Sequence, residues 1–355
     1  MQHWLRDATT PAEQEAVLRR LPRRTLTGIA SDARVDRAIS AAAALILFQR
    51  RPALLLQRAS AHRNEAEKWR RIATLRIVAL ADRETALPIL RRALSDADED
   101  VVGAAVRLLG EEQSDDALAL LVESLADGRY PRSQIAAYLD TERAAPHLLP
   151  LVDHPADDVR FWAASLLRPS ALDAELALAG LAADPSPRVR AAVLKSFAAV
   201  GGGASAAIGR DLIHDPTWFV RAQAARAIGS GGNPELVHRL VPLLRDEQWW
   251  VRTAAKEALA ELGPSAEHVL VPMLRDDDAF ARNGAAEVLL ETGAVARWAA
   301  KAADEPDDEP LSVMIGAALR AGGDRVQQAA LAAVTGRTRQ KLARLIEQMP
   351  DSTST

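Results

Sequence analysis

The sequence contains no cysteine, so disulfide bonds and thiol chemistry are both excluded. Aromatic residues make up only 4% of its 355 residues, which favours closely stacked helices over a sheet-rich core. The longest apolar run, residues 38–48, contains Ser40 and is far shorter than the roughly 20 residues that a membrane-spanning helix needs. A chain without cysteine is compatible with a reducing compartment, and we expect a cytoplasmic protein.

The spacings that mark common catalytic and metal sites are also missing. The seven histidines form no His-x-x-x-His or His-Glu pair, which removes the usual zinc signatures. There is no Gly-x-Gly-x-x-Gly, phosphate loop or Gly-x-Ser-x-Gly elbow, and Gly201-Gly202-Gly203 is typical of a connector between helices. We therefore predict no catalytic residue, no metal ligand and no cofactor, and we expect that the protein is not an enzyme.

The sequence does contain a repeat of about 30 residues. Each clear copy has an Asp, then Val-Arg or Ala-Arg with the Arg six residues after the Asp, then two small residues and an aliphatic one. The clearest copies are Asp184…Arg190, Asp215…Arg221, Asp246…Arg252 and Asp276…Arg282. With this Arg as the marker, weaker copies follow the same register at Arg70, Val102, Arg132, Arg160 and Ser312, and a degenerate one lies around Arg37. Internal repetition of this length predicts a solenoid.

Each repeat predicts two helices. The segment after the marker has helical periodicity and commonly reaches a glycine, where a helix C-cap favours a left-handed residue. These glycines are Gly110, Gly229, Gly263, Gly293 and Gly322. The helix before the Asp contains Pro242 or Pro272 at matched positions, and each proline should bend it. Because neither helix can bury its apolar face alone, we predict an all-α fold, an α-solenoid of about nine to ten stacked helix pairs.

A helix with an internal proline, followed by Asp-x-x-x-x-Val-Arg-x-x-Ala-Ala-x-x-Leu-Gly, resembles the HEAT repeat. The resemblance covers roughly residues 60–325 and is strongest to the short bacterial type found in phycobilisome lyase-like HEAT proteins. It implies a HEAT-like superhelix in which the first helix lies on the convex side and the Val-Arg helix lines the concave side. One enzymatic branch, the deoxyhypusine hydroxylase-like proteins, holds a di-iron site with His-Glu pairs, which this sequence lacks.

The repeat register also suggests domain boundaries. We expect residues 1–60 to form a basic N-terminal helical cap with a degenerate repeat, and residues 61–325 to form the HEAT-like solenoid. Residues 326–355 are expected to form a C-terminal capping helix and a polar tail. Because residues 345–355 are polar and follow the last apolar helix, we expect them to be frayed.

The recurring Asp and Arg are expected to be structural. An Asp at a turn between helices can cap the next helix, and an Arg can reach the Asp of its own or the adjacent repeat. A feature present in so many repeats is rarely a unique catalytic site. We therefore predict a structural ladder, interrupted at Val102 and Ser312, formed by Asp184, Arg190, Asp215, Arg221, Asp246, Arg252, Asp276 and Arg282.

Aromatic residues depart from the repeat pattern in three consecutive copies. The positions three and two before the marker hold Trp218-Phe219, Trp249-Trp250 and Ala279-Phe280, whereas other copies have polar or small residues there. Equivalent positions in stacked helices lie about 10 Å apart, so these side chains should form a row at the first turn of the Val-Arg helices. Exposed aromatics of this kind are typical binding hot spots, although core packing can account for one of each pair. The candidate partner-binding residues are Trp218, Phe219, Trp249, Trp250 and Phe280, extended by Phe161 and Trp162.

Charge is distributed unevenly along the chain. Residues 1–95 hold 18 Lys+Arg against 9 Asp+Glu, and residues 96–355 hold 26 against 39. The basic runs near Arg19, Arg23, Arg50 and Arg70 are either a solvated face or a site for an acidic partner or an anionic membrane surface.

The function that these patterns favour is a non-enzymatic protein-protein interaction scaffold, which binds a protein partner on the concave or edge surface of the solenoid. One alternative is a nucleic-acid-binding or DNA-glycosylase-like HEAT protein. The acidic balance of residues 96–355 disfavours it, because phosphates would be repelled where the aromatics lie. A second alternative, a chromophore-lyase-like subunit, follows from the repeat resemblance alone.

Overall fold

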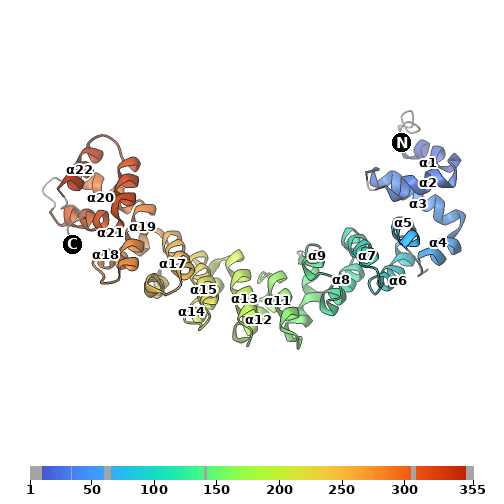
Figure 1. The fold of residues 1–355 in the computed structure, drawn as a ribbon, viewed down its shortest axis with the longest axis horizontal. Helices are drawn as coiled ribbons and strands as arrows, with labels where there is room; N and C mark the ends of the chain where they lie inside the picture. Colours follow the sequence, from blue (N-terminus) through green and yellow to red (C-terminus); the bar gives the residue numbers. More distant parts are fainter. Residues whose placement is uncertain (1–9, 33, 60–64, 140–141, 305–308, 349–355) are drawn as a thin grey trace. The chain divides into compact units, whose positions relative to one another are not determined.

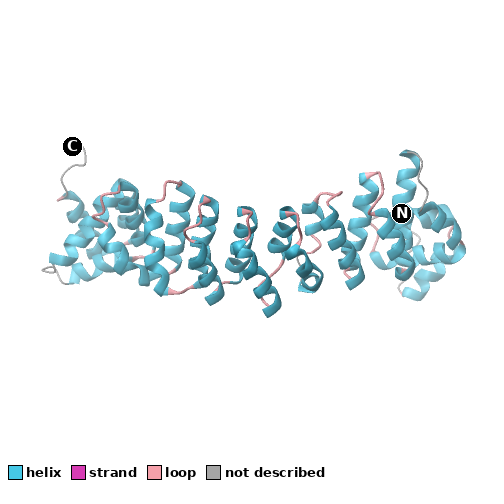
Figure 2. Ribbon diagram, turned by 90° about the horizontal axis from the view of Figure 1, so that it is seen from below, coloured by secondary structure: helices cyan, strands magenta, loops and turns pink. Residues whose placement is uncertain are grey.

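The computed structural model describes residues 10–32, 34–59, 65–139, 142–304 and 309–348. Within these ranges the chain forms helices joined by turns and contains no strand (Figures 1 and 2). The predicted all-α fold is confirmed. The predicted fraying of residues 345–355 falls mostly on residues 349–355, which lie outside the described ranges.

The chain divides into two compact units, Met1–Leu151 and Val152–Thr355. The first unit contains α1 (Pro11–Arg20), α2 (Arg23–Ser31), α3 (Arg37–Arg50), α4 (Pro52–Ala59), α5 (Glu65–Ala81), α6 (Arg83–Ala93), α7 (Glu99–Glu112), α8 (Asp115–Asp127), α9 (Arg132–Ala136), the 3-10 helix η2 (Glu142–Ala144) and α10 (Ala145–Leu148). The 3-10 helix η3 (Leu149–Asp153) spans the boundary. The domain boundaries expected at residues 60 and 325 stay predictions.

The second unit has the same kind of helix pairs. It contains α11 (Asp157–Leu166), α12 (Leu172–Gly180), η4 (Leu181–Ala183), α13 (Pro187–Val200), α14 (Gly202–Leu212), α15 (Trp218–Gly231), η5 (Pro234–Leu236), α16 (Val237–Leu240), η6 (Val241–Arg245), α17 (Trp249–Glu261), η7 (Gly263–Ala266), α18 (Glu267–Met273), α19 (Ala279–Glu291), α20 (Ala294–Asp304), α21 (Glu309–Ala333) and α22 (Gly336–Glu347). Gly323, with φ 62°, divides α21 into two helical segments.

The marker residues of the repeat, from Arg37 to Ser312, lie on ten different helices: α3, α5, α7, α9, α11, α13, α15, α17, α19 and α21. Within the first unit α3 packs on α5 and α5 on α7. Within the second unit each marker helix packs on the next, from α11 through to α21. The α-solenoid of about nine to ten stacked helix pairs is therefore confirmed.

Small residues after the marker explain this close stacking. In α15, Ala224 and Ala225 lie three and four residues after Arg221, and both are fully buried, as is Ile228 one turn later. Residues at these intervals share one face of a helix, and the short alanine side chain lets the next helix approach closely. The repeat therefore sets both the helical period and the spacing of the stack.

The prolines and glycines act differently from one repeat to another. At Pro242 the α-helix α16 gives way to the 3-10 helix η6, whereas Pro272 lies inside α18. Gly263 and Gly293 have positive φ, as the prediction of left-handed caps requires. That prediction is wrong for Gly110, Gly229 and Gly322, which are helical.

The helical glycines are explained by close packing. A Cβ atom on Gly110 would overlap the ring of Tyr138, and one on Gly229 would lie 2.8 Å from the Cα atom of Ala258 in the next marker helix. The left-handed residues that end these two helices are Gln113 and Gly232. At these positions glycine is needed for contact between repeats rather than for backbone conformation.

Among the described residues no helix has the length and apolar character needed to cross a membrane.

Candidate functional site

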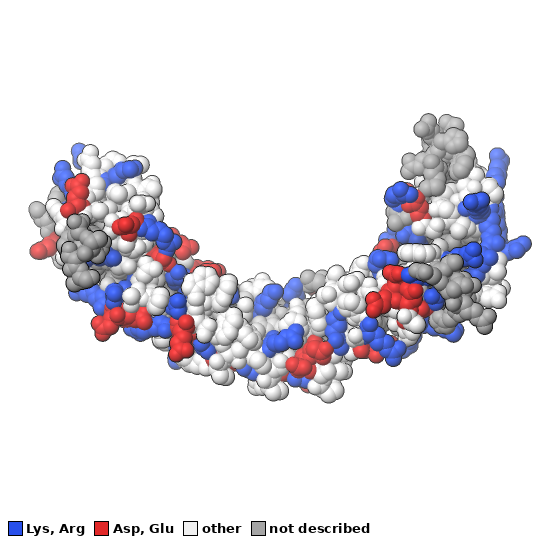
Figure 3. All heavy atoms as spheres, in the orientation of Figure 1, with Lys and Arg blue, Asp and Glu red and all other residues white. Residues whose placement is uncertain are grey.

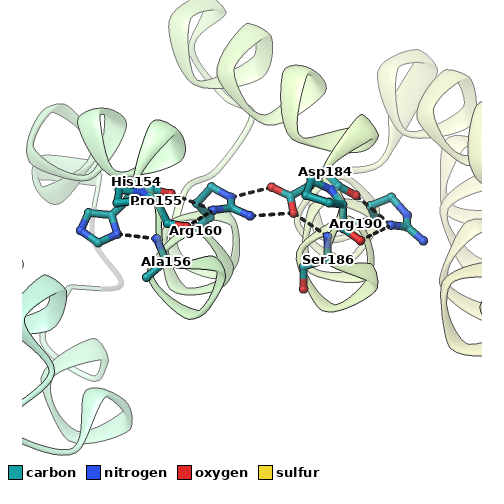
Figure 4. A network of polar contacts seen from close by, with 8 residues as sticks. His154, Pro155, Ala156, Arg160, Asp184, Ser186 and Arg190 are labelled. Atoms are coloured by element: carbon teal, nitrogen blue, oxygen red, sulfur yellow. Dashed lines mark hydrogen bonds and ion pairs between the residues drawn. The ribbon is translucent and has the colours of Figure 1, made fainter.

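The Asp of each clear repeat closes the turn between two helices. In Asp184 the Oδ1 atom accepts a hydrogen bond from the backbone N–H of Ser186 at 2.8 Å (Figure 4). Asp215 and Asp246 make the same contact with the residue two positions later, at 2.8 and 2.9 Å. The carboxylate therefore holds the backbone just before the next helix begins.

The marker Arg connects two repeats. The Nη1 atom of Arg160 donates to the carbonyl oxygens of His154 and Pro155 in its own repeat, at 2.8 and 3.0 Å. Its Nε and Nη2 atoms donate to the two carboxylate oxygens of Asp184 in the next repeat, at 2.6 and 3.1 Å (Figure 4). Equivalent two-point contacts join Arg190 to Asp215 and Arg221 to Asp246. Such fork-to-carboxylate pairs are stronger than single hydrogen bonds and fix the relative position of the two repeats.

These contacts control the ionisation of the aspartates. Burial raises the pKa of the Asp184 carboxyl, but the hydrogen bonds from Arg160 and from the backbone of Ser186 outweigh burial, so its pKa lies below the ordinary value. Burial likewise opposes the hydrogen bonds at Asp215 and Asp246, and the pKa of each is again lowered. The three carboxylates are therefore ionised in the folded protein at neutral pH.

We expect the second unit to lose stability as the pH falls below about 5. In the unfolded chain these carboxyls titrate near the ordinary value of 3.8, and in the folded chain they titrate at lower pH. Above about pH 5, where the carboxyls of the unfolded chain are also ionised, the pairs contribute in full. As the pH falls, protons bind the unfolded chain first, so the free energy of unfolding decreases until the folded-state pKa is passed.

Urea unfolding followed by tryptophan fluorescence measures this effect, because five of the seven tryptophans lie in the second unit. The variant Asp246→Asn provides the control, since it removes one titrating member of the ladder. A decrease in unfolding midpoint between pH 7 and pH 3 that is the same in this variant and in the wild-type chain would contradict the prediction.

The ladder changes at Arg252. Asp276 is held through both carboxylate oxygens by Arg245, at 3.1 Å from Nε to Oδ1 and by a second contact from Nη2. Arg252 keeps its contacts with the carbonyls of Asp246 and Glu247, but no hydrogen bond joins it to Asp276. Arg282 also contacts carbonyls of its own repeat, those of Asp276 and Asp277. Arg252 and Asp276, both assigned to the predicted ladder, therefore do not pair with each other, and Arg245, directly before Asp246, holds the Asp276 carboxylate instead.

In two other repeats the residue at the Asp or marker position differs from the one expected from the sequence. His154 occupies the Asp position of the Arg160 repeat, and its Nδ1 atom accepts the turn hydrogen bond from Ala156 at 3.2 Å (Figure 4). In the first unit the buried pair is Arg71 with Asp96, at 2.7 Å, so Arg71 rather than Arg70 occupies the marker position. The 25-residue separation of Arg71 and Asp96, equal to that of Arg190 and Asp215, is the sequence signal that identifies this pair.

The aromatic residues lie at the beginnings of three neighbouring helices of the second unit. Trp218 is the first residue of α15, Trp249 and Trp250 are the first two of α17, and Phe280 is the second of α19. Trp249 and Trp250 are 54% and 55% exposed, Trp218 is 39% exposed and Phe280 is 62% exposed. Phe219 is half-buried and meets Trp218 edge to face, with 5.6 Å between the ring centroids. We call these five residues the aromatic strip.

Neither Trp249 nor Trp250 belongs to the core, although core packing was a credible explanation for one of them. Their rings contact each other edge to face with centroids 4.6 Å apart, so the pair forms one projecting aromatic group. Phe161 and Trp162 are half-buried in α11, and Arg188 lies over the Phe161 ring. Among the described residues no ring contact joins them to the aromatic strip, and their part in binding stays a prediction.

A cavity of about 250 Å³ opens between α17 and α19, beside the aromatic strip. Trp249 and Phe280 line it together with Arg252, Thr253, Lys256 and Glu287. The Lys256 ammonium lies 2.6 Å from Glu287, and the Arg252 guanidinium lies over the Phe280 ring at 4.3 Å from its centroid. Sequence reasoning found the aromatic wall of this cavity but missed Lys256 and Glu287, whose pairing depends on the packing of two helices.

In the first unit, three of the basic runs meet at one cavity of about 340 Å³. Its walls carry five arginines, Arg23, Arg50, Arg51, Arg58 and Arg70, over an apolar floor that includes Leu47 and Ile77. Arg50 donates to the backbone carbonyls of Leu21 and Arg19, and among the described side chains no carboxylate neutralises any of the five. We call this cavity the arginine pocket. In the view of Figure 3, Lys and Arg side chains gather over the N-terminal helices.

No group of His, Asp or Glu within the described part of the chain is arranged to hold a metal ion.

Comparison with known proteins places the repeats in a family. The model of the HEAT repeats matches residues 52–140 and 206–290. No curated protein matches the sequence. Among solved structures, an engineered protein is 18% identical, with 97% of this chain and 96% of that chain covered and a TM-score of 0.40.

Two further similar structures are larger proteins. Kap121p bound to Pho4p is 14% identical, with 98% of this chain covered and a TM-score of 0.44; the Kap95:Nup1 complex is 14% identical, with 95% covered and a TM-score of 0.45. The chain spans about half the length of each, 50% and 56%. The two regions matched by the HEAT model have the helix pairs described above, and the chain contains HEAT repeats in both regions.

Proposed function

We propose that the protein is a non-enzymatic scaffold that binds a partner protein along the aromatic strip of its second unit. The observation that carries this proposal is the exposure of both Trp249 and Trp250, each more than half accessible at the start of α17. Helix stacking does not require them, because the same positions hold Asp157-Asp158 and Pro187-Arg188 in neighbouring repeats. Large rigid rings that remain exposed contribute strongly to binding when a partner covers them.

The spacing of the strip favours an elongated partner segment. Stacked helices place equivalent residues about 10 Å apart, which corresponds to about three residues of an extended chain. A segment that runs across α15, α17 and α19 in the polyproline II conformation, which has three residues per turn, would present every third side chain to the strip. A nucleic acid is a weaker candidate, since the turns beside the strip carry Asp246, Glu247 and Asp277. No observation favours a chromophore-lyase-like subunit, and a cytoplasmic location stays a prediction.

The scaffold proposal is tested by capturing the partner from the native cell with the full chain, crosslinking it, and mapping the crosslinks. Crosslinks to the first turns of α15, α17 or α19 would support the proposal. Capture that is unchanged when the indoles of Trp249 and Trp250 are removed would contradict it.

The arginine pocket supports a second binding function, in which the first unit binds an anionic membrane surface. Five guanidinium groups around one cavity repel one another unless anions neutralise them, and phosphate headgroups match the guanidinium fork. The apolar floor formed by side chains such as Leu47, Leu55 and Ile77 suits the glycerol and first acyl carbons of a lipid.

We expect the double variant Arg51→Gln/Arg70→Gln to bind vesicles of phosphatidylserine in phosphatidylcholine about thirtyfold more weakly, at about 1 kcal/mol per basic residue. The control is Arg92→Gln/Arg107→Gln, which makes the same change in net charge at two exposed arginines outside the pocket. Vesicle sedimentation measures both. Equal losses in the two variants would show that diffuse charge acts instead of the pocket, and absence of binding by the wild-type chain would contradict the proposal. Competition by inorganic phosphate alone would indicate a free-anion site.

A further inference from the structure

The guanidinium of Arg252 occupies the position of a carboxylate-binding group but binds no carboxylate of the next repeat. In the three preceding repeats, Nε and Nη2 of the marker Arg bind the Asp of the next repeat. Arg252 is held in the same way by backbone carbonyls, with Nη1 at 2.8 Å from the carbonyl oxygen of Asp246 and 3.1 Å from that of Glu247. Its Nε and Nη2 atoms have no hydrogen-bond partner among the described residues, because Arg245 occupies Asp276.

This guanidinium lines the 250 Å³ cavity between α17 and α19. Its Cζ atom lies 4.3 Å from the centroid of the Phe280 ring, which holds the guanidinium over an apolar surface and restricts its rotation. Trp249 forms another part of the wall. The group is therefore preorganised by contacts on one edge and on one face, and a ligand would not have to immobilise it.

The charges around the cavity favour an anion. Glu287, the carboxylate in the wall, is engaged by Lys256 at 2.6 Å, by Asn283 at 3.2 Å and by Arg325. Burial lowers the pKa of Lys256, and the positive charges of Arg325 and Arg252 lower it further. Of the charged residues that line the cavity, Arg252 and Lys256 are cations and Glu287 is the carboxylate, although the unit as a whole is acidic.

A second polar group in the wall is also without a partner. The hydroxyl oxygen of Thr253 is buried and makes no hydrogen bond with any described residue. Thr253 follows Arg252 directly and lines the same cavity. A buried hydroxyl without a partner is unfavourable.

We propose that this cavity binds the side-chain carboxylate of an Asp or Glu in the partner segment that lies along the aromatic strip. The Arg252 fork holds that carboxylate as Arg221 holds Asp246, and the adjoining part of the partner packs against Trp249 and Phe280. The inference rests on the proposed scaffold function. It specifies that the partner has an acidic residue where its segment passes between α17 and α19 of this chain. In this arrangement the partner supplies the carboxylate that Asp276 would supply if Arg245 did not hold it.

Two variants separate this role from simple packing. Arg252→Gln removes the fork. Arg245→Ala leaves the cavity wall intact but releases Asp276, which can then pair with Arg252 as in the preceding repeats. We expect both variants to weaken the binding of an acidic peptide by about tenfold or more, since hydrogen bonds to charged groups are among the stronger ones.

The test uses random linear 12-residue peptides displayed as internal segments, without free carboxyl termini, and selected on the full-length wild-type chain. We expect selected peptides to contain an Asp or Glu beside apolar residues. Changing that residue to Asn or Gln should weaken binding to the wild-type chain about tenfold and should have little further effect on Arg252→Gln. Peptides selected without an acidic residue should bind the wild-type chain and Arg252→Gln equally, which shows that the variant is folded.

The outcomes distinguish the two proposals. If selected peptides require Trp249 and Trp250 but their acidic residue contributes equally to binding the wild-type chain and Arg252→Gln, the carboxylate site is wrong and the scaffold proposal stands. If no peptide is enriched on the wild-type chain relative to Trp249→Ala/Trp250→Ala, the aromatic strip is not a binding surface and both proposals fail. A second library displays the peptides with free carboxyl termini. If carboxylate-dependent binding were enriched only from that library, the cavity would bind a terminal carboxylate, and the proposed side-chain carboxylate would be wrong.

Discussion

Replacing both Trp249 and Trp250 with alanine is expected to remove most of the affinity for the partner and to leave the second unit folded. An aromatic hot spot contributes about 2 kcal/mol or more, which corresponds to roughly a thirtyfold change in Kd for each residue. Because the two side chains are 54% and 55% exposed, their removal opens little internal space. The loss of stability should therefore be smaller than the about 3–5 kcal/mol that follows deletion of a core aromatic.

The measurement combines partner capture with urea unfolding of the same double variant. Trp69→Ala is the matched control, since Trp69 is 63% exposed and belongs to the first unit, whereas the strip belongs to the second. We expect this control to bind the partner normally. A large loss of stability in the double variant, with the remaining folded fraction still binding the partner, would show that the two tryptophans serve the fold instead.

The helix pairs could be predicted from the sequence because their determinants are local and periodic. Alanines three and four residues after the marker, such as Ala224 and Ala225 after Arg221, place small side chains on one helix face, and both are fully buried. The sequence left open whether the marker Arg contacts its own or the adjacent repeat. In the structure one guanidinium does both, through Nη1 to its own turn and through Nε and Nη2 to the next Asp.

The features that sequence reasoning missed depend on contacts between repeats. Arg245 reaches Asp276 across 31 residues, and only the stacking of the two repeats brings them together. Gly229 was interpreted as a cap, but the neighbouring helix explains it, because Ala258 leaves no room for a side chain. The arginine pocket combines runs that are far apart in the chain, from Arg23 to Arg70, and no single run indicates a cavity. Local patterns indicate which residues repeat, whereas packing decides which of them meet.

The second large effect is expected in the ladder, where Arg221→Ala should lower the free energy of unfolding by about 2 kcal/mol more than Arg252→Ala does. Both arginines occupy the same position in consecutive repeats and donate Nη1 to two backbone carbonyls. Only Arg221 also binds a carboxylate, that of Asp246, at 2.7 and 2.9 Å. Hydrogen bonds to charged groups contribute about 1.5–3 kcal/mol, whereas in place of a carboxylate Arg252 has a weaker contact with the Phe280 ring.

The pair is suited to this comparison because the Asp246 side chain is only 9% exposed, so that water cannot fully replace the lost guanidinium. Removing one member of a buried pair leaves the other charge uncompensated, which is the costly outcome. Urea unfolding at neutral pH measures the difference between the two variants, and partner capture by the folded fraction measures binding. Since Arg221 is engaged entirely within the ladder, we expect its variant to bind the partner normally. Loss of binding by Arg221→Ala with an unchanged unfolding midpoint would show that this residue contacts the partner and does not serve the ladder.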